Sequence, residues 1–326
     1  MNVRRFGRLS WMLSDVGYGM WGIGGGLHGW TGADDEEKWS ALECAVQLGC
    51  NFFDTAWVYG RGASERLLGM LLRQFPDNNL VVATKVPPKD MRWPPVKGIP
   101  LEQVYPVDHV LRYVDTSLEN LGTSAIDLLQ FHVWEDSWAA DPTWEHVVGM
   151  LRERGIIRGF GLSINRWEPT NALHALDTGL VDAVQVIYNI FDQAPEDDLF
   201  PYTMEHDIAV IARVPFDEGS LTGNLSADSR WPEGDWRNSY FVPENLVPTV
   251  ERVEALRADL PPTESLPDVA LRFILSHPGV STVIPGMRRP AHVRQNLAAS
   301  GRPLPTGVLE TLRRHRWDRK PTWWSQ

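Results

Sequence analysis

Four side chains with complementary chemistry follow short apolar runs in this sequence. Asp54 and Tyr59 lie in the stretch FFDTAWVYG, Lys85 ends the run VVATK, and His132 follows IDLLQF. A carboxylate, a phenol, an amine and an imidazole can together tune and move a proton. Taken singly, residues like these are more often structural: Asp54 could be a strand-end cap and Tyr59 an ordinary loop aromatic. Lys85 is harder to explain structurally, because strand interiors disfavour an unpaired ammonium.

The reaction that this set could carry out follows from the pKa values of its members. A tyrosine phenol, with a pKa of about 10, is a poor acid at neutral pH. An ammonium such as that of Lys85 would favour the phenolate of Tyr59, and a carboxylate would hold the ammonium in place. An imidazole can donate a hydrogen bond to a substrate oxygen. A phenol tuned in this way could protonate an alkoxide as a hydride reaches the carbonyl carbon.

The elements that must position these residues alternate between two kinds of segment. Short apolar runs typical of buried strands are followed in most cases by amphipathic segments with helical spacing. The predicted strands are 15–20, 51–56, 80–86, 126–132, 158–163, 183–188, 208–214 and 280–286. The predicted helices are 36–49, 63–75, 108–122, 143–155 and 244–260.

This alternation predicts an α/β fold with a parallel sheet covered on both faces. Eight such units favour a (β/α)₈ TIM barrel over a doubly wound sheet, and no linker divides residues 1–326 into domains. Segments 3–6 and 8–12, around Gly7, predict an N-terminal β-hairpin that plugs the bottom of the barrel. Barrel active sites form at the C-terminal ends of the strands, where large loops are expected here.

A glycine pattern in the first strand invites a different interpretation. Residues 17–22 read GYGMWG, which fits G-x-G-x-x-G, but a dinucleotide-binding fold needs a helix directly after this motif. The sequence continues IGGGLHGWTGADDEE, which cannot begin a helix before about Asp34. The pattern therefore argues against a Rossmann domain and for close approach of the backbone to a ligand.

The composition narrows the partners and the compartment. A net charge of -11 argues against nucleic acid, and no apolar window of about 18 residues predicts a membrane span. Cys44 and Cys50 do not form a disulfide pattern, and the N-terminus lacks the features of a signal peptide, so we expect a cytoplasmic protein. No two of the nine histidines fall within four residues of each other, which argues against a metal site.

Several segments together resemble the signature segments of the aldo-keto reductase superfamily. DTAWVYG, SERLLG, ATKV, LLQFH and GFGLS occur in the matching order and spacing, followed by QVIYN, VPFDEGSLTG and VIPGMRRPAHVRQN. The resemblance covers about residues 3 to 300. It implies an oxidoreductase that reduces an aldehyde, a ketone or a sugar-like carbonyl with NADPH, bound in extended form across the barrel mouth.

The resemblance also implies roles for individual residues. Tyr59 matches the catalytic acid/base, Lys85 and Asp54 its tuning pair, and His132 the residue that orients the carbonyl. The implied cofactor contacts are Gly19, Met20, Trp21, Ser163, Asn165, Gln185, Arg213, Pro215, Ser220, Leu221, Gly223, Gly286, Arg288, His292, Gln295 and Asn296. Among these, the resemblance assigns Ser163, Asn165 and Gln185 to the nicotinamide carboxamide, the 215–223 loop to the pyrophosphate, and Arg288 to the 2′-phosphate. Trp21, Trp57 and Trp134 are expected to wall the substrate pocket.

The sequence departs from the common family pattern in three ways. Ile164 separates Ser163 from Asn165, and Arg213 stands where a tyrosine commonly stacks on nicotinamide. Gly286 and His292 occupy common positions for cations near the 2′-phosphate, which leaves Arg288 and Arg289 for that task. NADPH is therefore the expected cofactor, with NADH as the alternative.

Two other functions remain open at this stage. The same residues could support a redox-neutral epimerase of a sugar or cyclitol, or the fold could serve as a nucleotide-sensing regulatory subunit. The substrate itself depends on loops 22–35, 87–107, 134–142 and 224–243. The sequence does not specify the oligomeric state.

Overall fold

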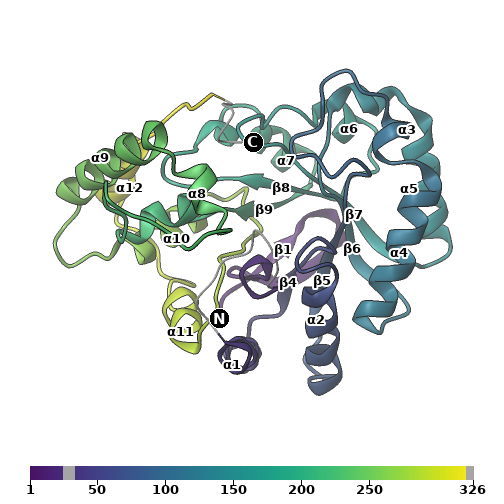
Figure 1. The fold of residues 1–326 in the computed structure, drawn as a ribbon, viewed down its shortest axis with the longest axis horizontal. Coiled ribbons are helices and arrows are strands. Elements are labelled where there is room, and N and C mark those ends of the chain that lie inside the picture. The colour runs from purple at the N-terminus through teal and green to yellow at the C-terminus, as the bar shows by residue number, and fades with distance from the viewer. Residues whose placement is uncertain (25–33, 321–326) are drawn as a thin grey trace.

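Eight parallel strands form a closed barrel in the computed structural model, which describes residues 1–24 and 34–320 (Figure 1). The strands pair in chain order, and bridges from Val16 to Val283 and from Gly19 to Gly286 join the first strand to the last. The predicted (β/α)₈ fold is confirmed, and each predicted run matches one strand, although β7 begins one residue before its run. The strands are β3 Tyr18–Gly19, β4 Phe52–Asp54, β5 Val81–Val86, β6 Ile126–Phe131, β7 Ile157–Ser163, β8 Ala183–Ile187, β9 Ala209–Arg213 and β10 Thr282–Val283.

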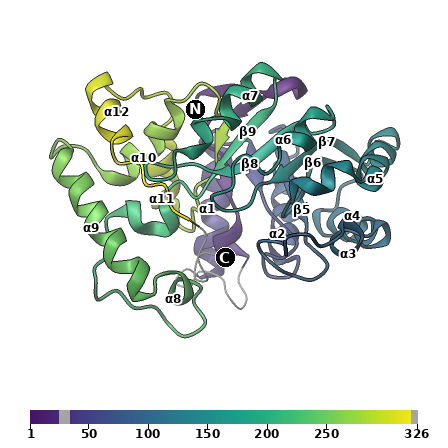
Figure 2. The ribbon, with the colours of Figure 1, turned by 90° about the horizontal axis from the view of Figure 1, so that it is seen from above.

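The helices surround this sheet, with α3, α4 and α5 on the side opposite α8, α9 and α12 (Figures 1 and 2). The five predicted helices correspond to α1, α2, α4, α5 and α9. Helices α3, α6, α7 and α8 were not predicted, because four to seven residues are too few to show a helical period. The helices are α1 Asp35–Gln47, α2 Ala63–Gln74, α3 Leu101–Val104, α4 Val107–Leu121, α5 Pro142–Glu153, α6 Leu173–Asp177, α7 Leu199–Glu205, α8 Arg237–Tyr240, α9 Pro243–Asp259, α10 Leu266–Leu275, α11 Pro290–Leu297 and α12 Thr306–Arg313.

Local sequence signals account for where several helices begin and end. The Asp34 carboxylate accepts a hydrogen bond of 2.7 Å from the Glu37 amide, which caps the start of α1. Pro142 occupies the first position of α5, where a missing N–H has no cost. Helix α4 stops at Gly122, whose φ of 68° places it in the left-handed region.

An antiparallel hairpin precedes the barrel, with β1 Val3–Phe6 paired to β2 Trp11–Ser14. A 3₁₀ turn, Gly7–Leu9, lies between the two strands. The expected second strand, 8–12, was therefore placed too early. The cause is Gly7, which has a φ of 46° and packs so closely that a Cβ atom would lie 2.6 Å from a backbone nitrogen of β9.

The hairpin closes the N-terminal end of the barrel, as predicted. Phe6 and Leu13 are buried in one cluster with Phe52, Ala83 and Leu128, which belong to three of the barrel strands. The Phe6 and Phe52 rings lie 5.8 Å apart. These contacts fill the bottom of the barrel with apolar side chains and leave its other end for polar ones.

Strand periodicity turns polar side chains into the barrel above this apolar layer. Residues two apart on a strand face the same side. Asp54, Lys85, Gln130 and Gln185 each lie two residues after an interior apolar residue, namely Phe52, Ala83, Leu128 and Ala183. The apolar floor therefore fixes which polar residues meet at the C-terminal end.

Other expectations from composition can be compared with the structure. Within residues 1–24 and 34–320, no helix has the length and apolar character needed to cross a membrane. Cys44 and Cys50 are both buried as unpaired thiols, in agreement with the absence of a disulfide pattern.

Candidate active site

The carboxylate of Asp54 is at the centre of the polar layer. Lys85 Nζ lies 2.6 Å from Asp54 Oδ2 and donates a second hydrogen bond of 2.8 Å to the Thr55 carbonyl. The Nε2 groups of Gln130 and Gln185 donate to Asp54 Oδ1 at 3.2 and 2.7 Å. Asp54 and Lys85 are 2% and 1% exposed, so this ion pair is buried and fixed from several strands.

The start of α2 braces the strand that carries Asp54. Thr55 Oγ1 donates a 2.7 Å hydrogen bond to Ser64 Oγ. The buried carboxylate of Glu65 accepts hydrogen bonds of 2.6 Å from Thr84 and 2.7 Å from Ser117. These bonds tie β4 and β5 to two helices, which gives the Ser-Glu pair of the SERLLG segment a structural explanation.

Tyr59 and His132 approach the Lys85 ammonium from separate loops. Lys85 Nζ lies 5.2 Å from the centre of the Tyr59 ring. The centres of the Tyr59 and His132 rings lie 5.9 Å apart, and the two rings meet edge to face. Gly60 has a φ of 68°, and a Cβ atom there would lie 2.0 Å from the Gly24 carbonyl oxygen. Only glycine fits this contact, which fixes the backbone beside Tyr59.

Burial raises the pKa of Tyr59 above its usual value of about 10. The nearby charges of Lys85 and Arg213 oppose this rise, whereas Asp54 adds to it. The Lys85 charge acts in the predicted direction, but burial is the larger effect, so the predicted lowering of the Tyr59 pKa is wrong. Tyr59 is therefore a protonated phenol at neutral pH.

His132 is held as a neutral imidazole. Burial, together with the positive charges of Lys85 and Arg213, lowers its pKa well below the usual value. Its Nδ1 is buried without a hydrogen-bond partner among the described residues, and its backbone amide donates to the Val86 carbonyl at 3.1 Å. The Trp93 ring lies edge-on at 5.5 Å. A neutral imidazole at this position can donate one hydrogen bond.

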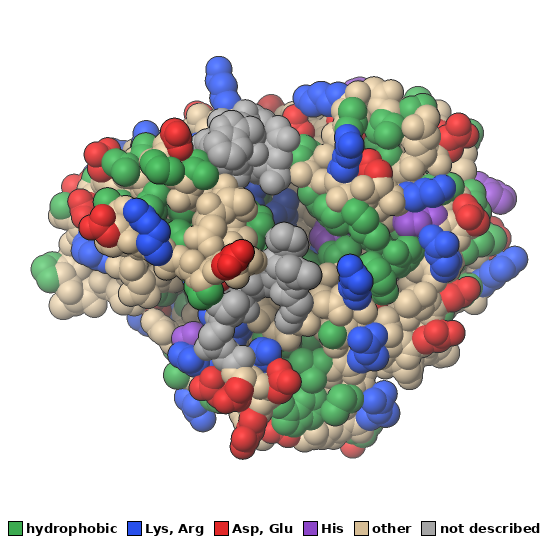
Figure 3. Space-filling model, in the orientation of Figure 1, with side chains coloured by type: hydrophobic (Ala, Val, Ile, Leu, Met, Phe, Trp, Pro, Cys, Tyr) green, Lys and Arg blue, Asp and Glu red, His purple; other side chains and the backbone are tan. Residues whose placement is uncertain are grey.

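A cavity of about 2040 Å³ opens above these residues, and Asp54, Tyr59 and His132 line it. Figure 3 shows the hollow, with basic and histidine side chains visible inside it. Most of the expected cofactor residues line the same cavity, although they come from distant parts of the chain. These are Gly19, Met20, Trp21, Asn165, Gln185, Arg213, Pro215, Gly286, Arg288, His292, Gln295 and Asn296.

Four expected cofactor residues do not line the cavity: Ser163, Ser220, Leu221 and Gly223. The amides of Leu221 and Gly223 donate within their own segment, to Phe216 and Ser220, each at 3.0 Å. Ser220 Oγ donates to Asp217, and Ser163 is buried. In the same segments, Ile164, Gly219 and Thr222 line the cavity.

Trp134 is not a pocket wall, contrary to expectation. Its side chain is fully buried in the core, with the rings of Trp138 and Trp144 at 5.7 and 5.3 Å. Its carbonyl accepts a 2.8 Å hydrogen bond from Asn165 Nδ2. Trp134 thus contributes to the site only by positioning Asn165.

The two other expected pocket walls, Trp21 and Trp57, do line the cavity. Trp93 and Trp236 line it as well, although sequence reasoning did not assign them to the pocket. Both lie in loops expected to cover the site, 87–107 and 224–243, and their tryptophans were the available signal. Most of the fourth substrate loop, 22–35, falls outside the described residues.

The far end of the cavity is suited to an anion. Arg288 and His292 line it next to the first turn of α11, which begins at Pro290. The N-terminus of a helix favours negative charge and offers backbone N–H donors. Both side chains are partly buried, and burial lowers the pKa of each. An anion bound there would therefore contact groups that have already lost part of their hydration. Among residues 1–24 and 34–320, no group of three histidine, cysteine or acidic side chains could hold a metal ion.

An eight-stranded barrel with an acid, a lysine, a tyrosine and a histidine at its strand ends is the arrangement expected of an aldo-keto reductase. Comparison with known proteins gives the same family. The chain belongs to the Aldo/keto reductase family, whose family model matches residues 15–316. It is 29% identical to the NADH-specific methylglyoxal reductase of Escherichia coli (strain K12), over 88% of this chain and 90% of that protein. It is also 29% identical to D-threo-aldose 1-dehydrogenase of Pseudomonas sp, over 91% and 92%.

A solved structure supports the same assignment. The glycerol dehydrogenase AKR11B4 from Gluconobacter oxydans superimposes with a TM-score of 0.75 and 27% identity, covering 96% of each chain. The predicted superfamily is thus confirmed, and the protein is an oxidoreductase of that family.

Proposed function

We propose that this protein reduces an aldehyde or ketone to the alcohol with NADPH, and that Tyr59 supplies the proton. The observation that carries the proposal is the position of the Tyr59 phenol, which lines the cavity between the Lys85 ammonium and the His132 ring. Its raised pKa suits a proton donor, since the phenol keeps its proton until a strong base forms next to it.

The residues along the cavity fit an extended dinucleotide. Arg288 and the start of α11 offer positive charge to the cavity, and Asn165, Gln185 and Arg213 line it as well, with Gln185 bonded to Asp54. Gly286 adds no side chain there, and a Cβ atom at this position would meet nothing within 4 Å. When bound, NADPH supplies a hydride to the carbonyl carbon of the substrate.

The chain's own residues then handle the oxygen and its proton. His132, as a neutral donor, orients the carbonyl oxygen, and the Tyr59 hydroxyl transfers its proton to that oxygen. The Lys85 ammonium stabilises the phenolate that remains. Asp54, held by Gln130 and Gln185, keeps the ammonium in place.

The walls of the cavity suggest the substrate class. Trp21, Trp57, Trp93 and Trp236 bring aromatic surface to its lining. Aromatic surface of this kind suits a small, partly apolar carbonyl or the apolar face of a sugar. The relatives named methylglyoxal reductase and D-threo-aldose 1-dehydrogenase, one named for a small carbonyl and one for a sugar, support both substrate classes.

A panel of aldehydes, ketones and aldoses tests the proposal, with NADPH consumption followed by absorbance and NADH in parallel. We expect turnover of at least one class by the wild type and turnover slower by about 10²-fold or more by Tyr59→Phe. Turnover by Tyr59→Phe at close to the wild-type rate would contradict the assigned role. A product with inverted configuration and no net consumption of NADPH would instead indicate an epimerase.

A further inference from the structure

The segment 214–223 follows β9 and has an unusual backbone. Val214, Asp217 and Glu218 have φ angles of 56°, 45° and 56°, in the left-handed region that non-glycine residues rarely adopt. A β-branched residue such as Val214 is especially disfavoured there. Such a conformation persists only when the surrounding structure holds it in place. The segment lines the cavity through Val214, Pro215, Phe216, Glu218, Gly219 and Thr222.

A residue of the C-terminal tail supplies one of these holding contacts. Arg319 Nη2 lies 2.7 Å from Asp217 Oδ1, and the same guanidinium is paired with Asp192 from the loop after β8. The Arg319 side chain is only 3% exposed, and it lies over the rings of Trp167 and Trp317 at 5.0 and 4.7 Å. This arginine therefore joins two loops at the top of the barrel.

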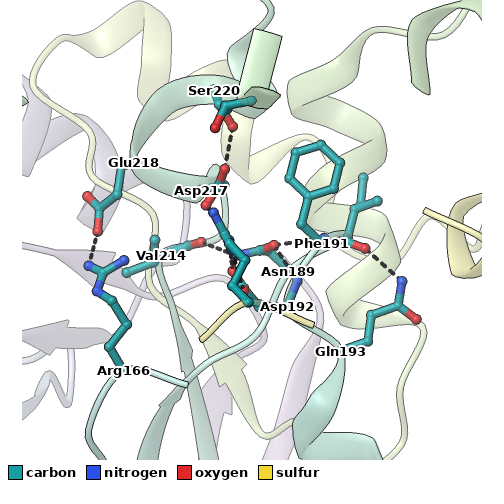
Figure 4. Close-up of polar contacts among 12 residues, drawn as sticks. Arg166, Asn189, Phe191, Asp192, Gln193, Val214, Asp217, Glu218 and Ser220 are labelled. Carbon is teal, nitrogen blue, oxygen red and sulfur yellow. Dashed lines mark hydrogen bonds and ion pairs between the residues drawn. The ribbon is translucent and has the colours of Figure 1, made fainter. Parts of the chain in front are cut away.

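Two further contacts complete the attachment of the segment (Figure 4). Arg166, from the loop after β7, pairs with Glu218 at 2.5 Å. Asn189 Nδ2 donates to the Val214 carbonyl at 3.0 Å and to Asp192 Oδ2 at 2.9 Å. The three unusual residues of the segment are thus each fixed by a polar partner, either directly or through their own carbonyl.

Arg319 supplies the positive charge that two buried carboxylates, Asp192 and Asp217, share. Asp192 and Asp217 are both buried. Burial raises the pKa of Asp192, the charge of Arg319 lowers it, and the charge of Asp217 raises it. Arg319 is the cation that pairs with both carboxylates. Without it, two buried negative charges would lie close together. Repulsion between them would then favour a different arrangement of 214–223.

We propose that Arg319 is a positioning residue: from the C-terminal tail, it holds the 214–223 segment in the shape that completes the cavity wall. The consequence for cofactor affinity rests on the proposed function, because it assumes that NADPH occupies this cavity.

Hydrogen exchange of the ligand-free protein tests the first part. The amides of Asp217, Gly219, Leu221 and Gly223 all donate within the segment. In Arg319→Gln we expect their exchange to be faster by about ten-fold or more, with partial recovery in Arg319→Lys. Arg316→Gln is the matched control. Arg316 lies three residues before Arg319 in the same tail, but it pairs on the surface with Asp197 and Asp318. Unchanged exchange in Arg319→Gln would overturn the proposal.

Steady-state kinetics with NADPH test the second part. We expect Arg319→Gln to raise the KM for NADPH by about ten-fold, while the KM for the carbonyl changes by less than about two-fold. Faster exchange with unaltered NADPH kinetics would overturn the link to the cofactor. A wild type that binds no NADPH would refute the proposed function, whereas the exchange experiment would still decide the role of Arg319.

A second variant protects the test against misfolding of Arg319→Gln. Asp217→Asn removes one carboxylate but keeps the pair between Arg319 and Asp192. It should speed exchange of the same four amides, because the tail then loses its ion pair with the segment. Full protection in folded Asp217→Asn would overturn the proposal.

Discussion

Lys85 Nζ and Asp54 Oδ2 lie 2.6 Å apart in a buried ion pair, and the same ammonium is 5.2 Å from the centre of the Tyr59 ring. The pair connects β4 to β5 and places a positive charge beside the phenol. Charge next to a buried phenol has more effect than charge in water, because the surroundings screen it less. We therefore expect both stability and catalysis to depend on this pair, and the two can be measured separately.

Replacing the lysine should affect both properties. Lys85→Met leaves the Asp54 carboxylate buried without its cation, which costs on the order of 3–5 kcal/mol when a buried pair is broken. Chemical denaturation should show this loss, and the folded fraction should have little carbonyl reductase activity. Lys97→Met is the control for stability, because Lys97 pairs with Glu168 at the surface, where ion pairs contribute little. Equal stability of the two variants would contradict the importance of the buried pair.

Removing the hydroxyl of Tyr59 should separate chemistry from binding. Tyr59→Phe keeps the ring but removes the proton donor, so we expect carbonyl reduction to fall by about 10²-fold or more. The affinity for NADPH, measured by fluorescence titration, should stay within a few-fold of the wild type. Lost NADPH binding in a folded Tyr59→Phe protein would mean that the hydroxyl has a different role.

The raised pKa of Tyr59 gives the two reaction directions opposite dependence on pH. Reduction needs the protonated phenol, so its rate should stay level through neutral pH and fall only on the alkaline side. Oxidation of the alcohol needs the phenolate, whose population increases with pH, so its rate should rise continuously up to at least about pH 9. Initial rates in both directions across this range provide the check. A plateau of oxidation near neutral pH would contradict a raised pKa.

The lowered pKa of His132 should make stability depend on pH. Below the unfolded-state value of about 6.5, the unfolded chain takes up a proton that buried His132 does not. The folded protein therefore loses stability as the pH falls below that value, by up to about 1.4 kcal/mol per pH unit for this one group. The free energy of unfolding should decrease more steeply with acid in the wild type than in His132→Gln. Parallel curves would mean that His132 does not contribute.

The barrel could be predicted because each buried strand appears in the sequence as its own apolar run. Such a run can be recognised without knowing which strands lie beside it. Asp54 and Lys85 could be paired for a similar reason, since strand ends of a parallel sheet meet at one edge. Burial of Tyr59 depends on every loop around it, so the sequence predicted the effect of Lys85 on its pKa but not the larger effect of burial.

Three of the expected cofactor residues that do not line the cavity, Ser220, Leu221 and Gly223, lie in the turns of one segment. The left-handed residues Asp217 and Glu218 rotate the 214–223 segment, so that Gly219 and Thr222 line the cavity while Leu221 is buried. No local signal indicates that Arg319, about a hundred residues later in the chain, pairs with Asp217 there. Trp134 was misassigned because a tryptophan after a strand end fits a pocket wall and a core position equally well.

The choice between NADPH and NADH should depend on Arg288. Its side chain lines the cavity near the start of α11, and its positive neighbours Arg237 and Arg289 contribute to lowering its pKa. A 2′-phosphate bound there would bring opposite charge to this basic group, whereas NADH has no such phosphate. Arg288→Ala should therefore weaken NADPH by about ten-fold or more and leave NADH within about two-fold.

Arg294→Ala is the matched control for this experiment, because Arg294 is an exposed arginine of α11 that does not line the cavity. Both variants are titrated with both cofactors at the same ionic strength, since long-range attraction of a phosphate depends on salt. Equal weakening of NADPH and NADH by Arg288→Ala would show that Arg288 does not read the 2′-phosphate. Stronger binding of NADH than NADPH by the wild type would place this chain with its NADH-specific relative in cofactor choice.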